Sequence, residues 1–389
     1  MQSLLLENAN IIAPGQNAEN ISISIDHGKI SESVGKIAPG AEVLDLSNIT
    51  LYAGFIDVHN HGAVGIDCNN ANSDELHEVS KFLAKNGVTS WLPTLVPDSS
   101  ENYQKSIDAI DELMQTQDAR EPAARVLGVH YEGPFVSEKQ CGALRVRYFR
   151  DFTKGDEISS LPKLKTAEAR HLITLAPEIP GGIELIKKLT AGGWVVSIGH
   201  TRAEVETLDA ACAAGARHLT HFFNAMTGLH HRNLGVVGWA LTNEEMGFDI
   251  IADNIHVHPQ IVELAVKTKG PEKVTLISDS VSPTGLGDGR FEIWGEKISV
   301  VKGKTQNERG SIAGSVITVL DAVKNLLSLG FSASEVSQMA AANPAKLLGI
   351  ESETGTIEVG KRADLVAVDA AGNVKLTIIG GRIAHFPKD

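Results

Sequence analysis

The stretch FIDVHNHG, residues 55–62, indicates how the central part of the chain folds. Its apolar residues are typical of a buried strand, and two histidines follow at its end. Side chains of an extended strand alternate between its two faces, so His59 and His61 project to the same side. Two buried neutral imidazoles are costly unless they share a partner, and imidazole is a common metal ligand. We therefore expect a buried strand that ends in a pair of metal ligands.

The composition of the 389-residue chain restricts its class and its partners. With 42% hydrophobic and 21% charged residues it can form a large core. A net charge of -13 argues against nucleic acid or an anionic membrane as a partner, because both require a basic face. A local arginine can still hold an anionic small molecule on such a protein.

The cysteines and the N-terminal residues bear on location. The three cysteines are scattered and lack the spacing of a zinc finger. The start, MQSLLLENAN, has no basic flank and does not resemble a signal peptide. No apolar stretch approaches the roughly 20 residues that span a bilayer. We expect a soluble cytoplasmic protein.

Short apolar runs alternate with amphipathic segments between about residues 54 and 350. The predicted helices cover 73–87, 101–114, 182–193, 203–215, 261–270 and 315–330. The first of them would bury Leu76, Val79, Phe82 and Leu83, with Ser73 as its N-cap. The eight predicted strands are 55–59, 89–94, 125–132, 172–178, 194–200, 218–223, 247–253 and 273–279.

Eight strands with intervening helices predict an α/β fold of the (β/α)8 TIM-barrel type over residues 54–350. An open, doubly wound sheet is the alternative that counting alone leaves open. Residues 1–53 and 351–389 instead show short alternating strands and glycine turns. We expect these two ends to pair into one small β-sandwich domain.

Polar residues recur where the predicted strands end, which is where barrel enzymes carry their chemistry. Each has an ordinary structural interpretation by itself: a lone histidine is usually hydrogen-bonded, Glu132 could be a salt-bridge partner, and Asp279 a helix cap. Their recurrence on several strands instead predicts one metal-dependent site. We expect Glu178 to support that site and His130 to pack inside the barrel. The strand-end residues are His59, His61, Glu132, Glu178, His200, His221 and Asp279.

Several segments together resemble the N-acetylglucosamine-6-phosphate deacetylase family of the amidohydrolase superfamily. They are GFIDVHNHG, GVHYEGPF, TLAPE, SIGHT, THFFNAM, IADNIHVHP, LISDSVSPTGLGDG and NPAKLLG. The likeness covers essentially the whole chain. It implies a metal-dependent barrel that hydrolyses the acetamide of an amino-sugar phosphate to acetate and a free amine.

The resemblance also implies roles for the strand-end residues. Glu132, His200 and His221 match the principal metal ligands of the family. His59 and His61 match positions that hold a second metal in some members, and Asp279 matches the catalytic acid/base. We expect one or two divalent ions per chain. Zinc is the first choice, although such ligands also accept iron, cobalt or manganese.

The family's substrate contacts map onto a further set of residues. The arginine that matches Arg232 reaches the sugar phosphate of the neighbouring subunit, which implies a homodimer. The implied substrate-binding residues are Ala143, Asn224, Ala225, Arg232, His256, Ile312, Ala313 and Gly314.

Two departures from the family pattern leave the sugar open. Leu144 stands where the family usually has a histidine that contacts the sugar, and Asn254 stands where a glycine is usual. N-acetylgalactosamine 6-phosphate and an unphosphorylated N-acetylhexosamine are therefore alternatives to N-acetylglucosamine 6-phosphate.

Two further alternatives concern the kind of protein. A dipeptidase or cyclic-amide hydrolase often bridges two metals with a strand-4 lysine, and LITLAPE at 172–178 has none. A catalytically inactive homologue acting as a binding protein would be expected to lose ligands or the strand-8 aspartate, and this chain retains all of them.

Overall fold

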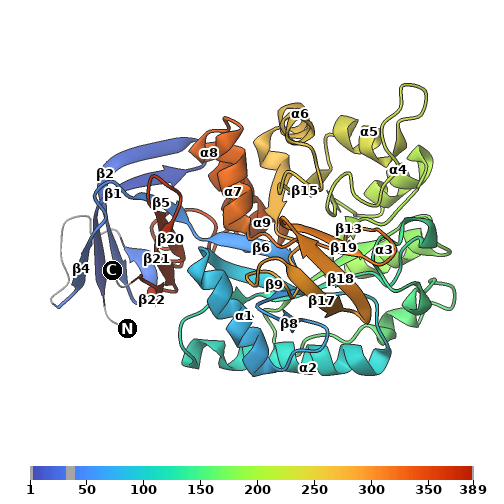
Figure 1. Cartoon of the computed structure of the whole chain (residues 1–389), viewed down its shortest axis with the longest axis horizontal. Helices are drawn as coiled ribbons and strands as arrows, with labels where there is room; N and C mark the ends of the chain where they lie inside the picture. Colours follow the sequence, from blue (N-terminus) through green and yellow to red (C-terminus); the bar gives the residue numbers. More distant parts are fainter. Residues whose placement is uncertain (1–2, 32–39, 388–389) are drawn as a thin grey trace.

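The computed structural model describes residues 3–31 and 40–387. Figure 1 shows two units: a barrel of strands surrounded by helices, and a β-sheet beside it. The barrel strands are nearly all buried, in keeping with their runs of apolar residues. Their order is β6, β9, β11, β12, β13, β14, β15 and β16, all parallel, and β10 (Arg125–Val126) precedes β11.

The bounds of the barrel strands are β6 (Phe55–Asn60), β9 (Val88–Leu95), β11 (Gly128–Glu132), β12 (Arg170–Leu175), β13 (Val195–Ile198), β14 (His218–Leu219), β15 (Gly247–Ile251) and β16 (Val274–Ile277).

The chain just after β16 meets the end of β6 and closes the ring of strands. The N–H of Asp279 donates to the carbonyl of His59 over 2.9 Å, and the N–H of His61 donates to the carbonyl of Ser280 over 2.8 Å. Asn60 and Ser280 pair in parallel there. An open sheet has two free edges, so this contact excludes it, and the predicted barrel is confirmed.

Helices follow most barrel strands and bury their apolar faces on the outside of the barrel (Figure 1). The predicted helices all form, and α5, which the sequence analysis did not separate, follows β14. The bounds are α1 (Ser73–Lys85), α2 (Ser100–Thr116), α3 (Gly182–Ala191), α4 (Val205–Ala213), α5 (Gly235–Thr242), α6 (Pro259–Lys269), α7 (Val319–Ser328), α8 (Ala333–Ser337) and α9 (Asn343–Leu347).

The N-cap of α1 differs from the prediction. Asn72, and not Ser73, is the cap: its side chain accepts from the N–H groups of Asp74 and Glu75. The Glu75 carboxylate accepts in return from the Asn72 N–H over 2.9 Å. This reciprocal pair satisfies more of the free N–H groups of the first turn than a serine one residue later would.

The two chain ends join in one sheet, as expected. Strand β5 pairs with β20 in antiparallel fashion, so the N-terminal and C-terminal strands form one hydrogen-bonded network. Leu6, Leu51, Leu365 and Ile378 belong to a separate hydrophobic cluster in this unit. Its strands are β1 (Leu4–Ala13), β2 (Gln16–Asp26), β3 (Lys29–Ser31), β4 (Glu42–Asp45), β5 (Thr50–Ala53), β20 (Leu365–Val368), β21 (Val374–Ile379) and β22 (Arg382–His385).

A three-stranded antiparallel sheet, absent from the sequence analysis, is inserted between β16 and α7 (orange in Figure 1). It consists of β17 (Gly289–Ile293), β18 (Glu296–Val301) and β19 (Lys304–Asn307). Trp294 and Gly295 form the turn between the first two strands, at φ 56° and 80°. A smaller hairpin, β7 (Gly62–Ala63) and β8 (Ile66–Asp67), directly follows β6.

Among the described residues, none of the helices combines the length and the apolar character that crossing a membrane requires.

Candidate metal centre and active site

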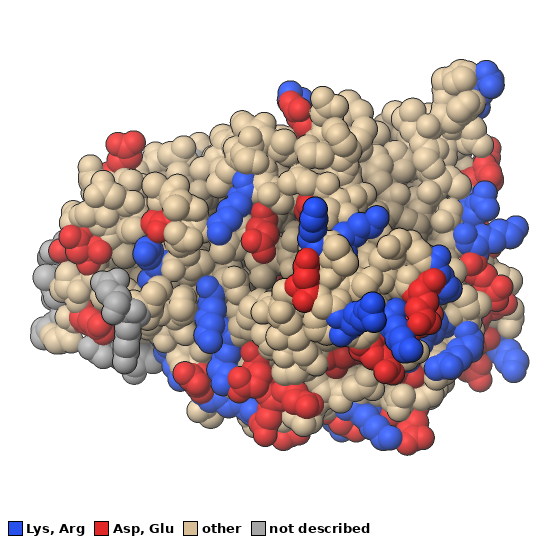
Figure 2. Space-filling view, viewed as in Figure 1, with Lys and Arg blue, Asp and Glu red and all other residues tan. Residues whose placement is uncertain are grey.

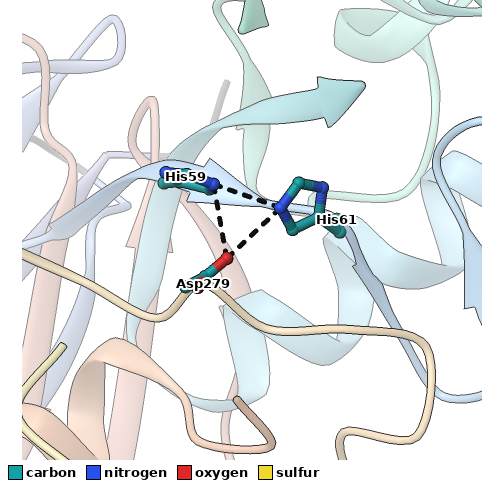
Figure 3. A group of neighbouring side chains, drawn as sticks. All are labelled: His59, His61 and Asp279. Atoms are coloured by element: carbon teal, nitrogen blue, oxygen red, sulfur yellow. Dashed lines mark hydrogen bonds and ion pairs between the residues drawn. The ribbon is translucent and has the colours of Figure 1, made fainter. Parts of the chain in front are cut away.

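Six of the strand-end residues converge in two buried groups with the composition of metal sites. One group is His59, His61 and Asp279, shown in Figure 3, and the other is Glu132, His200 and His221. The local chain explains why they meet. Glu132 is the last residue of β11, whereas His200, His221 and Asp279 each stand two residues beyond the end of β13, β14 and β16.

The first group is compact. The Nε2 atoms of His59 and His61 lie 3.1 Å apart. Both face Asp279 Oδ1, at 3.3 Å and 3.2 Å. The pairing of the strand-1 histidines with the strand-8 aspartate follows from the barrel closure described above.

The second group centres on Glu132. Its Oε1 atom lies 3.0 Å from the Nε2 atoms of both His200 and His221, and these two nitrogens are themselves 3.0 Å apart. The other carboxylate oxygen, Oε2, lies 3.3 Å from His61 Nε2. Glu132 therefore connects the two groups.

The outer nitrogens of two rings show that these donors suit a cation. His200 Nδ1 lies 2.7 Å from the carbonyl of Gln140, and His61 Nδ1 lies 3.2 Å from that of Thr94. A carbonyl only accepts, so each Nδ1 carries a proton and each Nε2 points into the site, where it can bind a cation in place of a proton. Metal-binding histidines are usually oriented in this way. Imidazole nitrogens and carboxylate oxygens at these positions fit one or two divalent cations.

The carboxylates dominate the electrostatics of the site. Burial disfavours ionised Glu132, but hydrogen bonds from His200 and His221 hold its pKa well below its usual range. Burial likewise disfavours charged His61, but Asp279 and Glu132 raise its pKa to about 10. Burial also disfavours charged His221, but its hydrogen bond with Glu132 and the nearby charges of Glu132, Asp279 and Asp249 together raise its pKa to about 9. The site thus attracts positive charge, which a divalent cation supplies in a more compact form.

His130 lies beneath this centre and stays neutral. Burial lowers its pKa to about 3. Its ring nitrogens lie 3.1 Å from the carbonyl of Val58 and 2.8 Å from Thr174 Oγ1, inside the barrel. This arrangement agrees with the expected packing role.

Three of the six candidate metal ligands have unusual backbone conformations. His200, His221 and Asp279 adopt φ angles of 48°, 34° and 49°. Residues other than glycine pay a conformational cost at positive φ, and such residues are concentrated at functional sites. Here the positive φ turns the main chain just past the end of each of the three strands.

A cavity of about 330 Å³ opens onto five of the six candidate metal ligands, all but His59. It is also lined by Leu144, Trp294 and Ser311. Ala313 is fully buried and lies beside the cavity in a small hydrophobic cluster, not in its lining. The other residues predicted to contact substrate, apart from Arg232, line the cavity: Ala143, Asn224, Ala225, His256, Ile312 and Gly314.

Arg232 is not part of the lining of the cavity of its own chain. It belongs to the loop 220–234 between β14 and α5, which projects from the body of the molecule in Figure 1. Its side chain is exposed, and its Nη1 lies 2.6 Å from His231 Nε2. Arg232 is the only Lys or Arg in the sequence of this loop, and Figure 2 shows basic atoms at the top of the projection.

Glu178 supports the loop that carries His200. Its carboxylate accepts from Thr201 Oγ1 over 2.5 Å and from the Arg202 N–H over 2.7 Å. It belongs to neither of the two groups that could hold a metal ion.

Trp294 also lines the cavity, and the sequence analysis did not identify it as a site residue. Its indole ring meets the His61 ring edge-on, with 5.2 Å between centroids. The segment GRFEIWGEKISVV, 289–301, alternates apolar and polar residues around the Trp294–Gly295 turn. That hairpin pattern was the available signal.

Comparison with known proteins agrees with this geometry. The model of the amidohydrolase family matches residues 50–384. An N-acetylglucosamine-6-phosphate deacetylase of Bacillus subtilis is 34% identical over 394 residues, covering 100% of this chain and 98% of that protein. An N-acetylgalactosamine-6-phosphate deacetylase of Escherichia coli O157:H7 is 35% identical, covering 85% of this chain and 87% of that protein.

Solved structures give the same result. The N-acetylglucosamine-6-phosphate deacetylase of Pasteurella multocida superposes with a TM-score of 0.89 at 28% identity, covering 98% of this chain and 99% of that one. A mutant deacetylase of Mycobacterium smegmatis in complex with N-acetyl-D-glucosamine-6-phosphate also gives 0.89 at 28% identity, covering 99% and 100%. The chain therefore belongs to the amidohydrolase family.

Proposed function

We propose that this protein is a metal-dependent deacetylase that hydrolyses the N-acetyl group of an N-acetylated amino-sugar 6-phosphate. N-acetylglucosamine 6-phosphate is the first candidate, and the products are acetate and the amino-sugar phosphate. The main support for the proposal is the placement of Glu132, Asp279 and four histidines in two connected groups that could hold metal ions and that open onto a cavity. Relatives that match nearly the whole chain have this activity in their names.

The residue types account for the chemistry. A divalent cation, zinc in the first instance, lowers the pKa of water and polarises the amide carbonyl when bound. Glu132, His200 and His221 would hold the principal ion, and His59 and His61 with Asp279 the second. The Asp279 carboxylate accepts a proton from the attacking water and then delivers it to the amine nitrogen, which otherwise leaves badly.

The cavity lining supplies the substrate contacts of this proposal. Asn224 and His256 offer polar side chains to the sugar phosphate. Main-chain and small side-chain contacts come from Ala143, Ala225 and the segment 312–314.

The exposed position of Arg232 on a projecting loop supports a homodimer in which it binds the phosphate of the neighbouring subunit's substrate. An exposed arginine that does not line its own cavity would serve an anionic substrate across an interface. The negative net charge of the protein makes such a dedicated cation more important.

The protein is further proposed to act in the cytoplasm, since its cysteines are all free. We also retain the domain division at residues 1–53, 54–350 and 351–389. Gly54 between β5 and β6 and the return of β20 to the sheet of β5 support it.

N-acetylgalactosamine 6-phosphate is the second candidate substrate. Leu144 lines the cavity, where the family histidine that contacts the sugar would otherwise stand. The change removes one polar contact, and one relative is named for the galactosamine substrate.

Acetate release from purified protein tests the proposal. The panel comprises N-acetyl-glucosamine, -galactosamine and -mannosamine, each with and without the 6-phosphate. Acetate release from one of the phosphorylated sugars, abolished by a chelator, is expected. No release from any of the six sugars, with metal bound, would instead favour an inactive binding protein or an amidohydrolase of other specificity.

A further inference from the structure

The lining of the catalytic cavity combines polar and apolar side chains from different segments. Asn224 and His256, which follow β14 and β15, contribute polar groups. The segments after β11 and β16 contribute apolar side chains: Leu144 and Trp294 line the cavity and pack in one hydrophobic cluster. A mixed lining suits a substrate with one polar and one apolar substituent.

Trp294 is held in place at a conformational cost. It occupies the β17–β18 turn at φ 56°, where glycine or asparagine is the usual choice. A bulky residue at positive φ persists only when the surrounding structure enforces it. The edge-on contact with His61 and the packing against Leu144 supply that support.

A second cavity lies on the other side of Trp294. Its volume is about 450 Å³, and it is lined by charged residues that include Asp67, Arg145, Arg147 and Glu292. Trp294 lines both cavities, so its side chain is part of the partition between them.

We infer that Trp294 is a specificity-determining residue: with Leu144 it holds the methyl group of the scissile acetamide and limits the length of the acyl chain. This inference rests on the proposed deacetylase function. The two substituents of an amide diverge from its carbonyl, which must lie at the metal ligands. Sugar hydroxyls need hydrogen-bonding partners and so face Asn224 and His256. Leu144, which stands where the family usually has a sugar-contacting histidine, cannot hydrogen-bond a hydroxyl, so a methyl group is best placed against Leu144 and Trp294.

The partition makes a definite prediction about acyl length. Each methylene in a hydrophobic pocket changes discrimination by about 10- to 200-fold. The wild-type protein should therefore prefer N-acetyl over N-propionyl and N-butyryl glucosamine 6-phosphate. Shortening Trp294 connects the cavity to the space behind it and should relax that preference.

Trp294→Gly is the test variant, because glycine adopts positive φ without strain and preserves the turn. In this variant, kcat/KM for the N-butyryl substrate divided by kcat/KM for the N-acetyl substrate should be at least tenfold higher than in wild type. Trp294→Phe, which retains an aromatic wall, is the matched control and should keep the ratio close to wild type. Leu144→Ala opens the same wall from a different segment and should shift the ratio in the same direction as Trp294→Gly.

An unchanged ratio in both Trp294→Gly and Leu144→Ala, with metal content retained, overturns the inference. So does a change in preference between glucosamine and galactosamine substrates with no change in acyl preference, because the wall would then contact the sugar. If the wild-type protein releases acetate but the variants keep the wild-type acyl preference, only the role of Trp294 is refuted. Wild-type protein that releases no acyl group from any substrate refutes the proposed function itself.

Discussion

The main-chain N–H of Asp279 donates to the carbonyl of His59 over 2.9 Å, and this bond joins the last strand region of the barrel to the first. The same two residues face each other through their side chains, with 3.3 Å between His59 Nε2 and Asp279 Oδ1. The seam that closes the barrel is thus also one side of the candidate metal centre. A change that opened the seam would displace ligands contributed by segments more than 200 residues apart in sequence.

Metal content should depend on which group of ligands is altered. We expect up to two divalent ions per chain in protein that has not been exposed to chelators, measured by elemental analysis. His61→Asn should lose one ion and retain the other, because Glu132, His200 and His221 are unchanged. Glu132→Gln should lower the occupancy of both ions, since Glu132 Oε1 faces His200 in one group and Oε2 faces His61 in the other.

Chelation provides the matching activity measurement. Removal of metal should abolish acetate release, and addition of zinc should restore it. Full activity in excess chelator, from protein in which no metal is detected, would contradict the metal-dependent mechanism. A single ion in wild-type protein would contradict only the second site.

Asp279→Asn should lower kcat by about 10² or more, because the amide keeps the shape of the side chain but cannot accept the proton. Elemental analysis should still find the ion held by Glu132, His200 and His221. Near-normal turnover in this variant would show that another group is the base.

Much of the candidate site was predictable from two facts: side chains alternate between the two faces of a strand, and a barrel brings the ends of its strands together. The HxH pair projects to one side of a strand, and the polar ends of parallel strands meet at one end of a barrel. These two facts place Glu132, His200, His221 and Asp279 near His59 and His61 without any knowledge of side-chain contacts.

Other features depend on tertiary contacts that local sequence does not encode. The Trp294 wall belongs to a hairpin inserted into the cycle, and only the folded chain shows that the hairpin tip returns to His61. Ala313 lies within a segment matched to substrate binding, but packing turns it into a hydrophobic cluster. The N-cap shift from Ser73 to Asn72 depends on which of two adjacent cap-forming residues finds a reciprocal partner.

His171, outside the active site, should make stability depend on pH. Burial, assisted by the nearby charge of Lys163, lowers its pKa to about 4, and its Nε2 accepts from the Leu164 N–H over 3.2 Å. The unfolded chain, with a histidine pKa of about 6.5, binds more protons than the folded one below that pH. This contribution to the free energy of unfolding is therefore present above pH 6.5 and is lost as the pH falls toward 4, by up to about 3 kcal/mol.

Urea unfolding at pH 7 and pH 5 measures this effect. His171→Gln keeps a hydrogen-bond acceptor but cannot titrate, so its stability should fall less between the two pH values than that of wild type. Equal losses in the two proteins would show that His171 is already charged in the folded state or that its environment is unimportant.

Arg232→Ala should lower kcat/KM for the phosphorylated substrate by about ten- to a hundredfold, because a charge-assisted contact contributes about 1.5–3 kcal/mol. The unphosphorylated sugar should be little affected. Arg290, an exposed arginine on β17, provides the control, and Arg290→Ala should leave both rates unchanged. An equal effect of Arg232→Ala on both substrates would contradict a phosphate contact.

A mixed dimer distinguishes whether Arg232 acts within its own chain or across the interface. Asp279→Asn and Arg232→Ala chains, carrying different affinity tags, are co-expressed and the heterodimer is isolated. If Arg232 serves the neighbouring site, the Arg232→Ala chain has an intact Asp279 and receives Arg232 of the partner subunit, so one site of two is complete. The heterodimer should then show about half the wild-type activity, well above either mutant homodimer.

If Arg232 serves its own site, both sites of the heterodimer are defective and its activity should equal the mean of the two homodimers. If light scattering detects no dimer, the proposed assembly is contradicted. Arg232, exposed on the projecting loop, would then have no neighbouring site to reach.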